Sequence, residues 1–95
     1  MIPLSSTITL SKEVLSQEVS GETVLLDLQS ESYFGLDAVG TRIWQLLQQD
    51  GKLQQVFDTL LEEYDVEAVQ LKKDMNDLLN KLMDAELISV EPDTK

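Results

Sequence analysis

The chain has 95 residues, of which 42% are hydrophobic, and its formal net charge is -11 at pH 7. A chain of this length buries roughly 60 to 65% of its unfolded surface, so we expect one domain spanning residues 1–95. Seven Lys and Arg residues face eighteen Asp and Glu residues, whereas a protein that binds a nucleic-acid duplex needs several cations on one face. The charge therefore argues against nucleic acid and favours a basic or neutral peptide partner. The plain alternative is that the acidic surface only maintains solubility.

Two residue types that carry much of enzyme chemistry are missing, because the chain has no Cys and no His. Without them the usual nucleophile–base triads, a disulfide framework and a thiolate metal site cannot be built. Neighbouring acids such as Glu62 and Glu63 are typical of a solvated helix face. The glycines are too scattered for a phosphate-binding loop. We expect a protein that is not an enzyme, with no catalytic residue, no metal and no cofactor.

The N-terminal segment from Met1 to Thr7 has neither the basic residues nor the long apolar run of a signal peptide. No window of the sequence approaches the ~20 apolar residues that span a bilayer. These features predict a cytoplasmic protein without a membrane partner.

The first third of the chain alternates apolar and polar residues, which predicts β-strands. The first strand contains Ile8 and Leu10, the second runs from Val14 to Val19, and the third runs from Thr23 to Leu28. Gly21 can adopt the positive φ of a tight turn between the second and third strands. The pattern predicts a three-stranded antiparallel meander.

The remainder of the chain has the period of α-helices. Asp37 is suited to cap a first helix that begins at Ala38, and Gly51 stands at the C′ position beyond its end. The second helix is predicted from Leu53 to Tyr64, and a short break follows it. The apolar face of the first helix comprises Val39, Ile43, Leu46 and Leu47.

The third helix is predicted from Glu67 to Ala85, and a last short strand from Leu87 to Val90. The elements together predict an α+β fold, with a three-stranded antiparallel sheet followed by three helices in a winged helix-turn-helix-like arrangement. The core stripe of the third helix comprises Leu71, Met75, Leu78, Leu79 and Leu82.

The third predicted strand is the clearest candidate for a binding surface. Val24, Leu26 and Leu28 point to one side of it, whereas Thr23, Leu25 and Asp27 point to the other. If the strand lies at a sheet edge, its free amides and carbonyls can accept an extended peptide as an additional strand. The alternative is that Leu25 packs beneath the third helix.

Aromatic residues and the single arginine suggest packing rather than ligand binding. We expect Trp44 and the Tyr33-Phe34 pair to pack the first helix onto the sheet, although aromatics also anchor interfaces. Arg42 is expected to pair with a nearby acid.

The order of several segments resembles the PqqD family, small adaptors that bind the leader peptides of ribosomally made natural products (RiPPs). The residues from Val24 to Asp37 form a strand, a turn and an aromatic return, and Gly40 and Ile43-Trp44 follow in the helix. The resemblance extends from about Leu10 to Val90 and includes the segments Tyr64-Asp65-Val66 and Leu87-Ile88 and the residues Asp74, Leu78, Leu79 and Leu82.

The resemblance implies where a leader peptide binds. In this family the leader adds antiparallel to the third strand and lies in the cleft between that strand and the third helix. On the helix, Lys72, Lys73 and Asn76 are candidates for polar contacts, whereas Met75 and Leu79 either line an apolar pocket or belong to the core. The implied strand contacts are Val24, Leu25, Leu26, Asp27 and Leu28.

The resemblance also implies two partners, the leader region of a precursor peptide and the enzyme that modifies it. That enzyme is a leader peptidase, a cyclase or a radical SAM enzyme, as in lasso peptide or pyrroloquinoline quinone (PQQ) biosynthesis, and the chain acts as a stand-alone, chaperone-like recognition element. A winged-helix transcriptional regulator and an interaction adaptor without a leader peptide stay open as alternatives. We expect a monomer, with a dimer through the edge of the third strand as the alternative.

Overall fold

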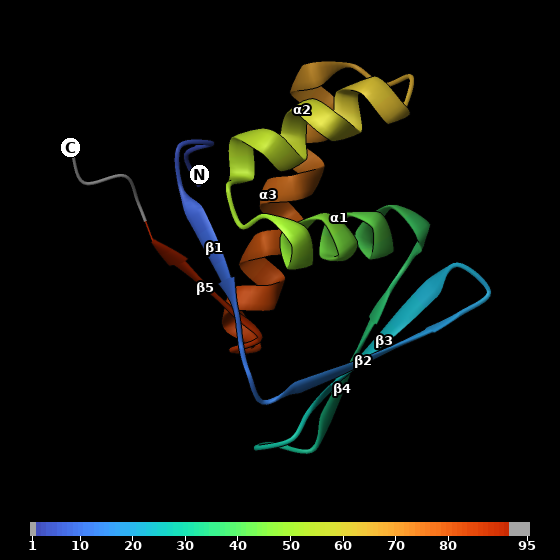
Figure 1. Cartoon of the computed structure of the whole chain (residues 1–95), viewed down its shortest axis with the longest axis vertical. Helices are drawn as coiled ribbons and strands as arrows, with labels where there is room; N and C mark the ends of the chain where they lie inside the picture. The colour runs from blue at the N-terminus through green and yellow to red at the C-terminus, as the bar shows by residue number, and fades with distance from the viewer. Residues whose placement is uncertain (1, 92–95) are drawn as a thin grey trace.

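Five strands and three helices make up the part of the chain that the computed structural model describes, residues 2–91 (Figure 1). The helices begin and end within a residue or two of the predicted limits. None of these helices is long and apolar enough to cross a bilayer. In chain order the elements are β1 (Thr7–Leu10), β2 (Val14–Val19), β3 (Glu22–Asp27), β4 (Ser32–Leu36), α1 (Ala38–Gln49), α2 (Leu53–Glu63), α3 (Ala68–Asp84) and β5 (Ile88–Glu91).

The strands form two separate antiparallel sheets. One has three strands in the order β2-β3-β4, and the other pairs β1 with β5. The predicted three-stranded antiparallel sheet is confirmed, but the assignment of its strands is wrong, because the first predicted strand pairs with the C-terminal strand. The aromatic return after Asp27 provides the third strand of the meander instead.

Two tight turns set the register of the meander. Ser20 and Gly21 both have positive φ, 54° and 82°, the conformation of a two-residue type I′ hairpin turn, and Val19 therefore pairs with Glu22. In the turn between β3 and β4, the Asp27 carboxylate accepts hydrogen bonds from the Gln29 N–H and from the Ser30 hydroxyl, both at 3.0 Å. These side-chain bonds hold β4 beside β3.

The core lies between the three-stranded sheet and the helices. α1 crosses the inner face of this sheet (Figure 1) and contacts β3 and β4. Leu25 is 0% exposed and lies in the core, and its strand, β3, contacts α1. The neighbouring α2 and α3 complete the core with Leu60, Met75 and Leu79 among its fully enclosed residues.

Local capping and packing explain where α1 begins and ends. The Asp37 carboxylate accepts a hydrogen bond from the Gly40 N–H at 2.8 Å, which confirms the predicted N-cap. Gly51 is required by space rather than by positive φ, because a Cβ there would collide with the carbonyl oxygen of Ile8. The loop after α1 therefore passes close to β1.

One ion pair joins α1 to α2. Arg42 donates through Nε to Glu63 Oε1 at 2.8 Å and through Nη2 to Oε2 at 2.6 Å. This hydrogen bonding raises the pKa of Arg42 and lowers the pKa of Glu63. The expected pairing of Arg42 with an acid is confirmed.

Candidate functional site

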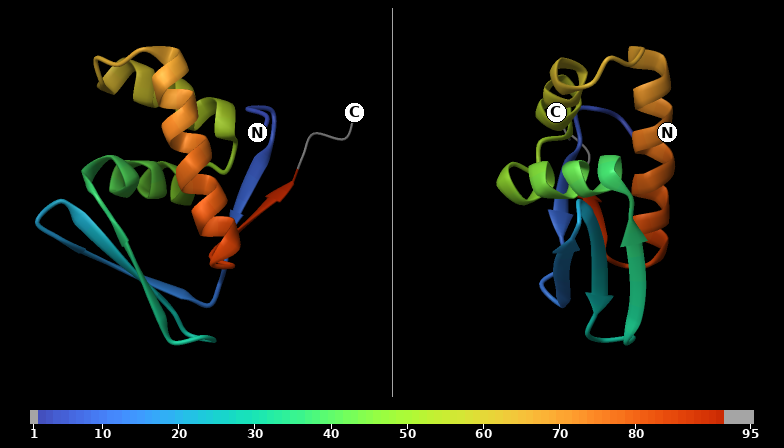
Figure 2. Two further views of the ribbon diagram at one scale, coloured as in Figure 1. Left: turned by 180° about the vertical axis from the view of Figure 1, so that it is seen from behind. Right: turned by 90° about the vertical axis from the view of Figure 1, so that its right-hand side faces the viewer.

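β3 does not have a free edge. It pairs with β2 along one side and with β4 along the other, so its amides and carbonyls are already used in the sheet. The expectation that residues 24–28 form an edge strand is therefore wrong, and the expected route to a dimer through that edge is closed. In this sheet, β2 and β4 each pair with β3 alone, and β4 is the strand nearest α3 (Figure 2).

Two adjoining hollows lie beside α3: one of about 260 Å³ between β4 and α3, and one of about 380 Å³ between the start of α1 and α3. The two hollows share Asp37 and Gly40 at the β4–α1 junction and Leu78 and Lys81 on α3. We refer to the two hollows together as the β4–α3 groove. The groove is lined by Phe34, Gly35, Leu36, Asp37, Val39, Gly40, Ile43, Asp74, Asp77, Leu78 and Lys81.

The floor of the groove is apolar and its rim is acidic. Leu36 and Ile43 are buried in the floor, and Leu78 is half-buried. Val39 lies on the wall and is partly exposed, although it was expected in the core. On α3 the lining residues recur at positions 74, 77, 78 and 81, which places them on one helix face. The ionisable groups are three aspartates and one lysine: Asp37, Asp74, Asp77 and Lys81.

The predicted strand residues lie outside this groove. Leu25 and Asp27 are buried on the inner face of β3, and the Asp27 carboxylate is engaged in the turn that follows. The outward side of the strand carries the other three residues, because side chains alternate along a strand. These three are Val24 and Leu26 on β3 and Leu28, which directly follows it and is exposed.

The predicted helix residues are on α3, but on other faces than the groove. Met75 and Leu79 are buried in the core. Asn76 accepts a hydrogen bond from the Ile2 N–H through Oδ1 at 2.8 Å. Lys72 and Lys73 are exposed and do not line either hollow. The period of the apolar residues identified the helix. Of these residues, Leu78 at the edge of the stripe is the one that lines the groove.

The two aromatic predictions have different outcomes. Trp44 is buried in the core, as expected. The expectation that Tyr33 packs α1 onto the sheet is wrong, because its side chain is 75% exposed. Tyr33 pairs with Leu26, so it shares the outward face of the sheet. Phe34 follows it, points inward and lines the groove.

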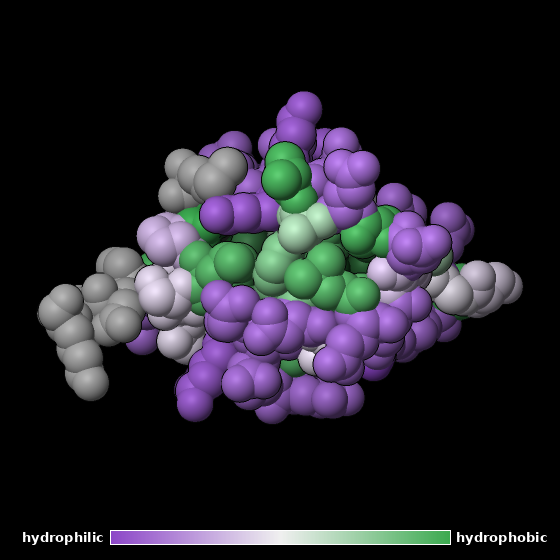
Figure 3. Space-filling model, turned by 90° about the horizontal axis from the view of Figure 1, so that it is seen from above, coloured by the Kyte–Doolittle hydropathy of each residue, from purple (hydrophilic) through white to green (hydrophobic). Residues whose placement is uncertain are grey.

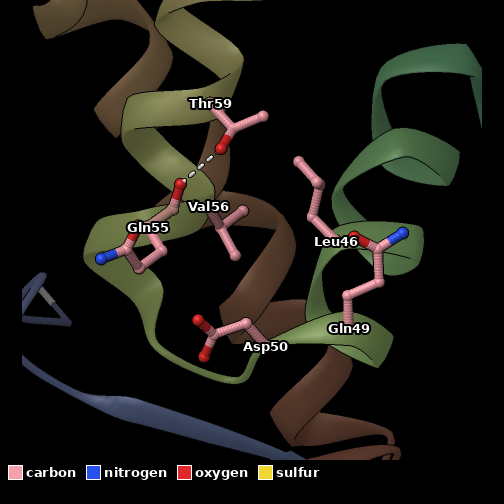
Figure 4. Close-up of a pocket in the computed structure, with 6 residues that line it drawn as sticks. All are labelled: Leu46, Gln49, Asp50, Gln55, Val56 and Thr59. Carbon is pink, nitrogen blue, oxygen red and sulfur yellow. Dashed lines mark hydrogen bonds between the residues drawn. The ribbon is translucent and has the colours of Figure 1, made fainter.

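Two other surface features lie outside the groove. A hollow of about 140 Å³ lies between α1 and α2, where the Thr59 hydroxyl donates to the Gln55 carbonyl oxygen at 2.9 Å (Figure 4). Apolar side chains also gather at the helical end of the molecule inside a polar rim (Figure 3). Val66, between α2 and α3, and Val69, in the first turn of α3, are exposed. The hollow between α1 and α2 is lined by no strand residue, and residues 2–91 contain no cluster of ligands suited to a metal ion. The β4–α3 groove is therefore the candidate site.

Comparison with known proteins gives two findings. The family model described as coenzyme PQQ synthesis protein D (PqqD) matches residues 22–88. The solved structure described as TbiB1 in complex with the TbiA(beta) leader peptide is 40% identical in sequence, with a TM-score of 0.81, and the match covers 85% of this chain and 94% of that chain. No curated protein sequence matches. The family match spans most of the chain, and the chain therefore belongs to the PqqD family.

Proposed function

We propose that the chain binds the leader segment of a ribosomally made precursor peptide as an added strand on β4, inside the β4–α3 groove. The observation that carries the proposal is the free edge of β4 next to an apolar groove. TbiB1, which is similar over most of its length, has been solved with a leader peptide. Because β4 is the third strand of the three-stranded sheet, the strand and helix of the family binding mode correspond here to β4 and α3.

Strand addition uses the main chain for affinity and the side chains for selection. Alternate residues of β4 direct their N–H and C=O groups away from β3, toward the added strand. Alternate side chains of that strand then point inward, toward Phe34 and Leu78, and the others point outward. The groove thus favours a peptide with an apolar side chain on its inward face.

The aspartates of the rim favour a basic residue in the same peptide. Asp74 and Asp77 lie on the α3 side of the groove, and Lys81 is the single base among its lining residues. Each partly exposed ion pair contributes about 0.2 to 1 kcal/mol. Two such pairs strengthen binding by about twofold to thirtyfold at low salt, and less at higher salt.

In this function the chain is a single recognition domain and not a catalyst. It holds the leader in a winged helix-turn-helix-like body and raises the effective concentration of the precursor for a separate cytoplasmic enzyme. A leader peptidase, a cyclase or a radical SAM enzyme fits this role, as in lasso peptide or PQQ-like pathways.

The test is a titration of fluorescein-labelled synthetic leader peptides, taken from precursor reading frames near this gene, with anisotropy as the readout and scrambled peptides as controls. Trp44 is unsuitable as a probe because it is buried in the core. We expect a Kd in the micromolar range or tighter, on the order of -8 kcal/mol. Failure of every authentic leader to bind would refute the proposal.

Two substitutions locate the peptide. Leu78→Ser removes apolar surface from the groove and should weaken binding by about tenfold or more, since a buried Leu side chain contributes about 1.5 to 3 kcal/mol. Val69→Ser is the matched control, because Val69 is on the same helix, exposed and outside the groove. Equal affinities of the two variants would exclude the β4–α3 groove as the binding site.

The charge of the groove is tested separately. Asp77→Asn should weaken the binding of a lysine-containing leader by a few-fold at low salt, and the loss should shrink as salt is added. Glu62→Gln on α2 removes one exposed acid outside the groove and should have no such effect. A leader whose affinity does not respond to Asp77→Asn would show that the rim does not select basic residues.

A further inference from the structure

The outer face of the three-stranded sheet carries a continuous apolar row. Leu15 on β2 is paired with Leu26 on β3, which in turn is paired with Tyr33 on β4. Val24 lies next to Leu26 on the same side of β3, opposite Gly35. No element of residues 2–91 covers this face, which is turned away from α1 (Figures 1 and 2). We call it the outer sheet face.

Several apolar side chains on this face are exposed. Leu15 is 57% exposed, and Val19, Val24, Leu28 and Tyr33 are also exposed. Three strands about 4.8 Å apart and about six residues long give an area of roughly 300 Å². Contiguous apolar patches of roughly 300 to 600 Å² are often functional. The outer sheet face therefore has the size of a transient protein contact.

The segment that forms the sheet carries charge of one sign, and Lys12 lies just before it. The part of the sequence that contains the sheet, residues 13–41, has no Lys or Arg. Arg42, the next base along the chain, is paired with Glu63 on the helices. The exposed acids of the segment that lie outside the groove are Glu13, Glu18, Glu22 and Glu31.

We propose that the outer sheet face docks the enzyme that acts on the bound peptide, through an apolar surface of that enzyme rimmed by Lys and Arg. The identity of this partner as the peptide-modifying enzyme rests on the proposed function. A second copy of the chain is disfavoured, because face-to-face packing would bring two acidic rims together, and juxtaposed like charges cost several kcal/mol.

The same face is continuous with the peptide site. A strand added to β4 becomes the fourth strand of the sheet, and its outward side chains extend the row that ends at Tyr33. The added strand widens the face by about 4.8 Å. The enzyme thus meets a larger apolar surface on the loaded domain than on the free one, and its affinity for the loaded domain is higher.

The experiment measures two affinities for each variant of the whole chain. The first is the affinity for a labelled leader peptide. The second is the affinity for the purified leader peptidase or modifying enzyme encoded beside this gene, with and without saturating leader, by biolayer interferometry. Leu15→Glu and Val19→Glu place a charge on β2, the strand of the sheet farthest from the groove. Val69→Glu is the control, because it introduces the same charge at an exposed valine on α3.

We expect Leu15→Glu and Val19→Glu to bind leader within about twofold of the unchanged chain but to bind the enzyme at least about tenfold more weakly. Val69→Glu should retain both affinities, circular dichroism should show all variants folded, and the enzyme's affinity should fall with salt. Unchanged enzyme affinity in the two β2 variants would overturn the proposal. So would a dimer, seen by analytical ultracentrifugation, that these substitutions dissociate. Absence of leader binding by the unchanged chain would refute the proposed function alone, because enzyme affinity is measured separately on the free domain.

Discussion

A substitution at Leu25 tests directly whether β3 is the enclosed central strand of the three-stranded sheet. It is 0% exposed, and its neighbours across the sheet are Ser16 on β2 and Phe34 on β4. Replacement by Ala removes three carbon atoms from a site enclosed by the sheet and α1. Fully buried Leu→Ala changes cost about 2 to 5 kcal/mol, from lost burial and from the cavity left behind. We expect Leu25→Ala to lower the free energy of unfolding by about 3 kcal/mol.

Urea titration followed by circular dichroism measures this loss. A domain of this length has a total stability of roughly 5 to 14 kcal/mol, so the variant should stay folded at 25 °C but melt some 12 to 24 °C lower. Leu28→Ala is the matched control, because Leu28 follows the same strand and is 47% exposed. It should lose less than about 1 kcal/mol.

Peptide binding separates a core role of Leu25 from a direct contact. With the variant folded, Leu25→Ala should keep its affinity for leader, because Leu25 does not line the β4–α3 groove. A loss of stability as small as that of Leu28→Ala would refute the central, enclosed position of β3. A large loss of leader affinity in the folded variant would refute the assignment of the peptide to β4.

Two further predictions concern close packing and pH. Gly51→Ala should destabilise the chain by about 1 to 3 kcal/mol in urea titration, because its Cβ would collide with the Ile8 carbonyl oxygen. Gly35→Ala should be nearly neutral because a Cβ there meets no atom within 4 Å, and equal effects would contradict this reasoning. The Arg42 hydrogen bonds lower the pKa of Glu63 in the folded chain below its value in the unfolded chain. The ion pair therefore stabilises the fold fully at a pH above the unfolded pKa, and this stabilisation is lost as the pH falls through the folded pKa. The difference in urea midpoint between the unchanged chain and Glu63→Gln should accordingly narrow from pH 7 to pH 3, and a constant difference would argue against the ion pair.

Features that depend on neighbouring residues were predictable from the sequence. The 3.6-residue period of apolar side chains identified the three helices, and Asp37 marked the start of α1 because its carboxylate bonds an amide only three residues away. Gly21 likewise indicated the β2–β3 turn, since it adopts the positive φ that such a turn requires. The charge balance alone argued against a nucleic-acid partner. The resemblance to the PqqD family was carried by the order of these local segments.

Strand pairing and the position of the site were decided only by the tertiary structure. Local alternation shows that a segment is extended, but it does not show which partner the segment takes, and β1 pairs with β5 at the far end of the chain. The addition of β4 turned β3 from an edge strand into a central one and moved the free edge beside α3. The apolar period of α3 could not show that its flank at Leu78, rather than Met75 or Leu79, faces a groove. These features depend on contacts between distant segments, and such contacts form only when the whole core is assembled.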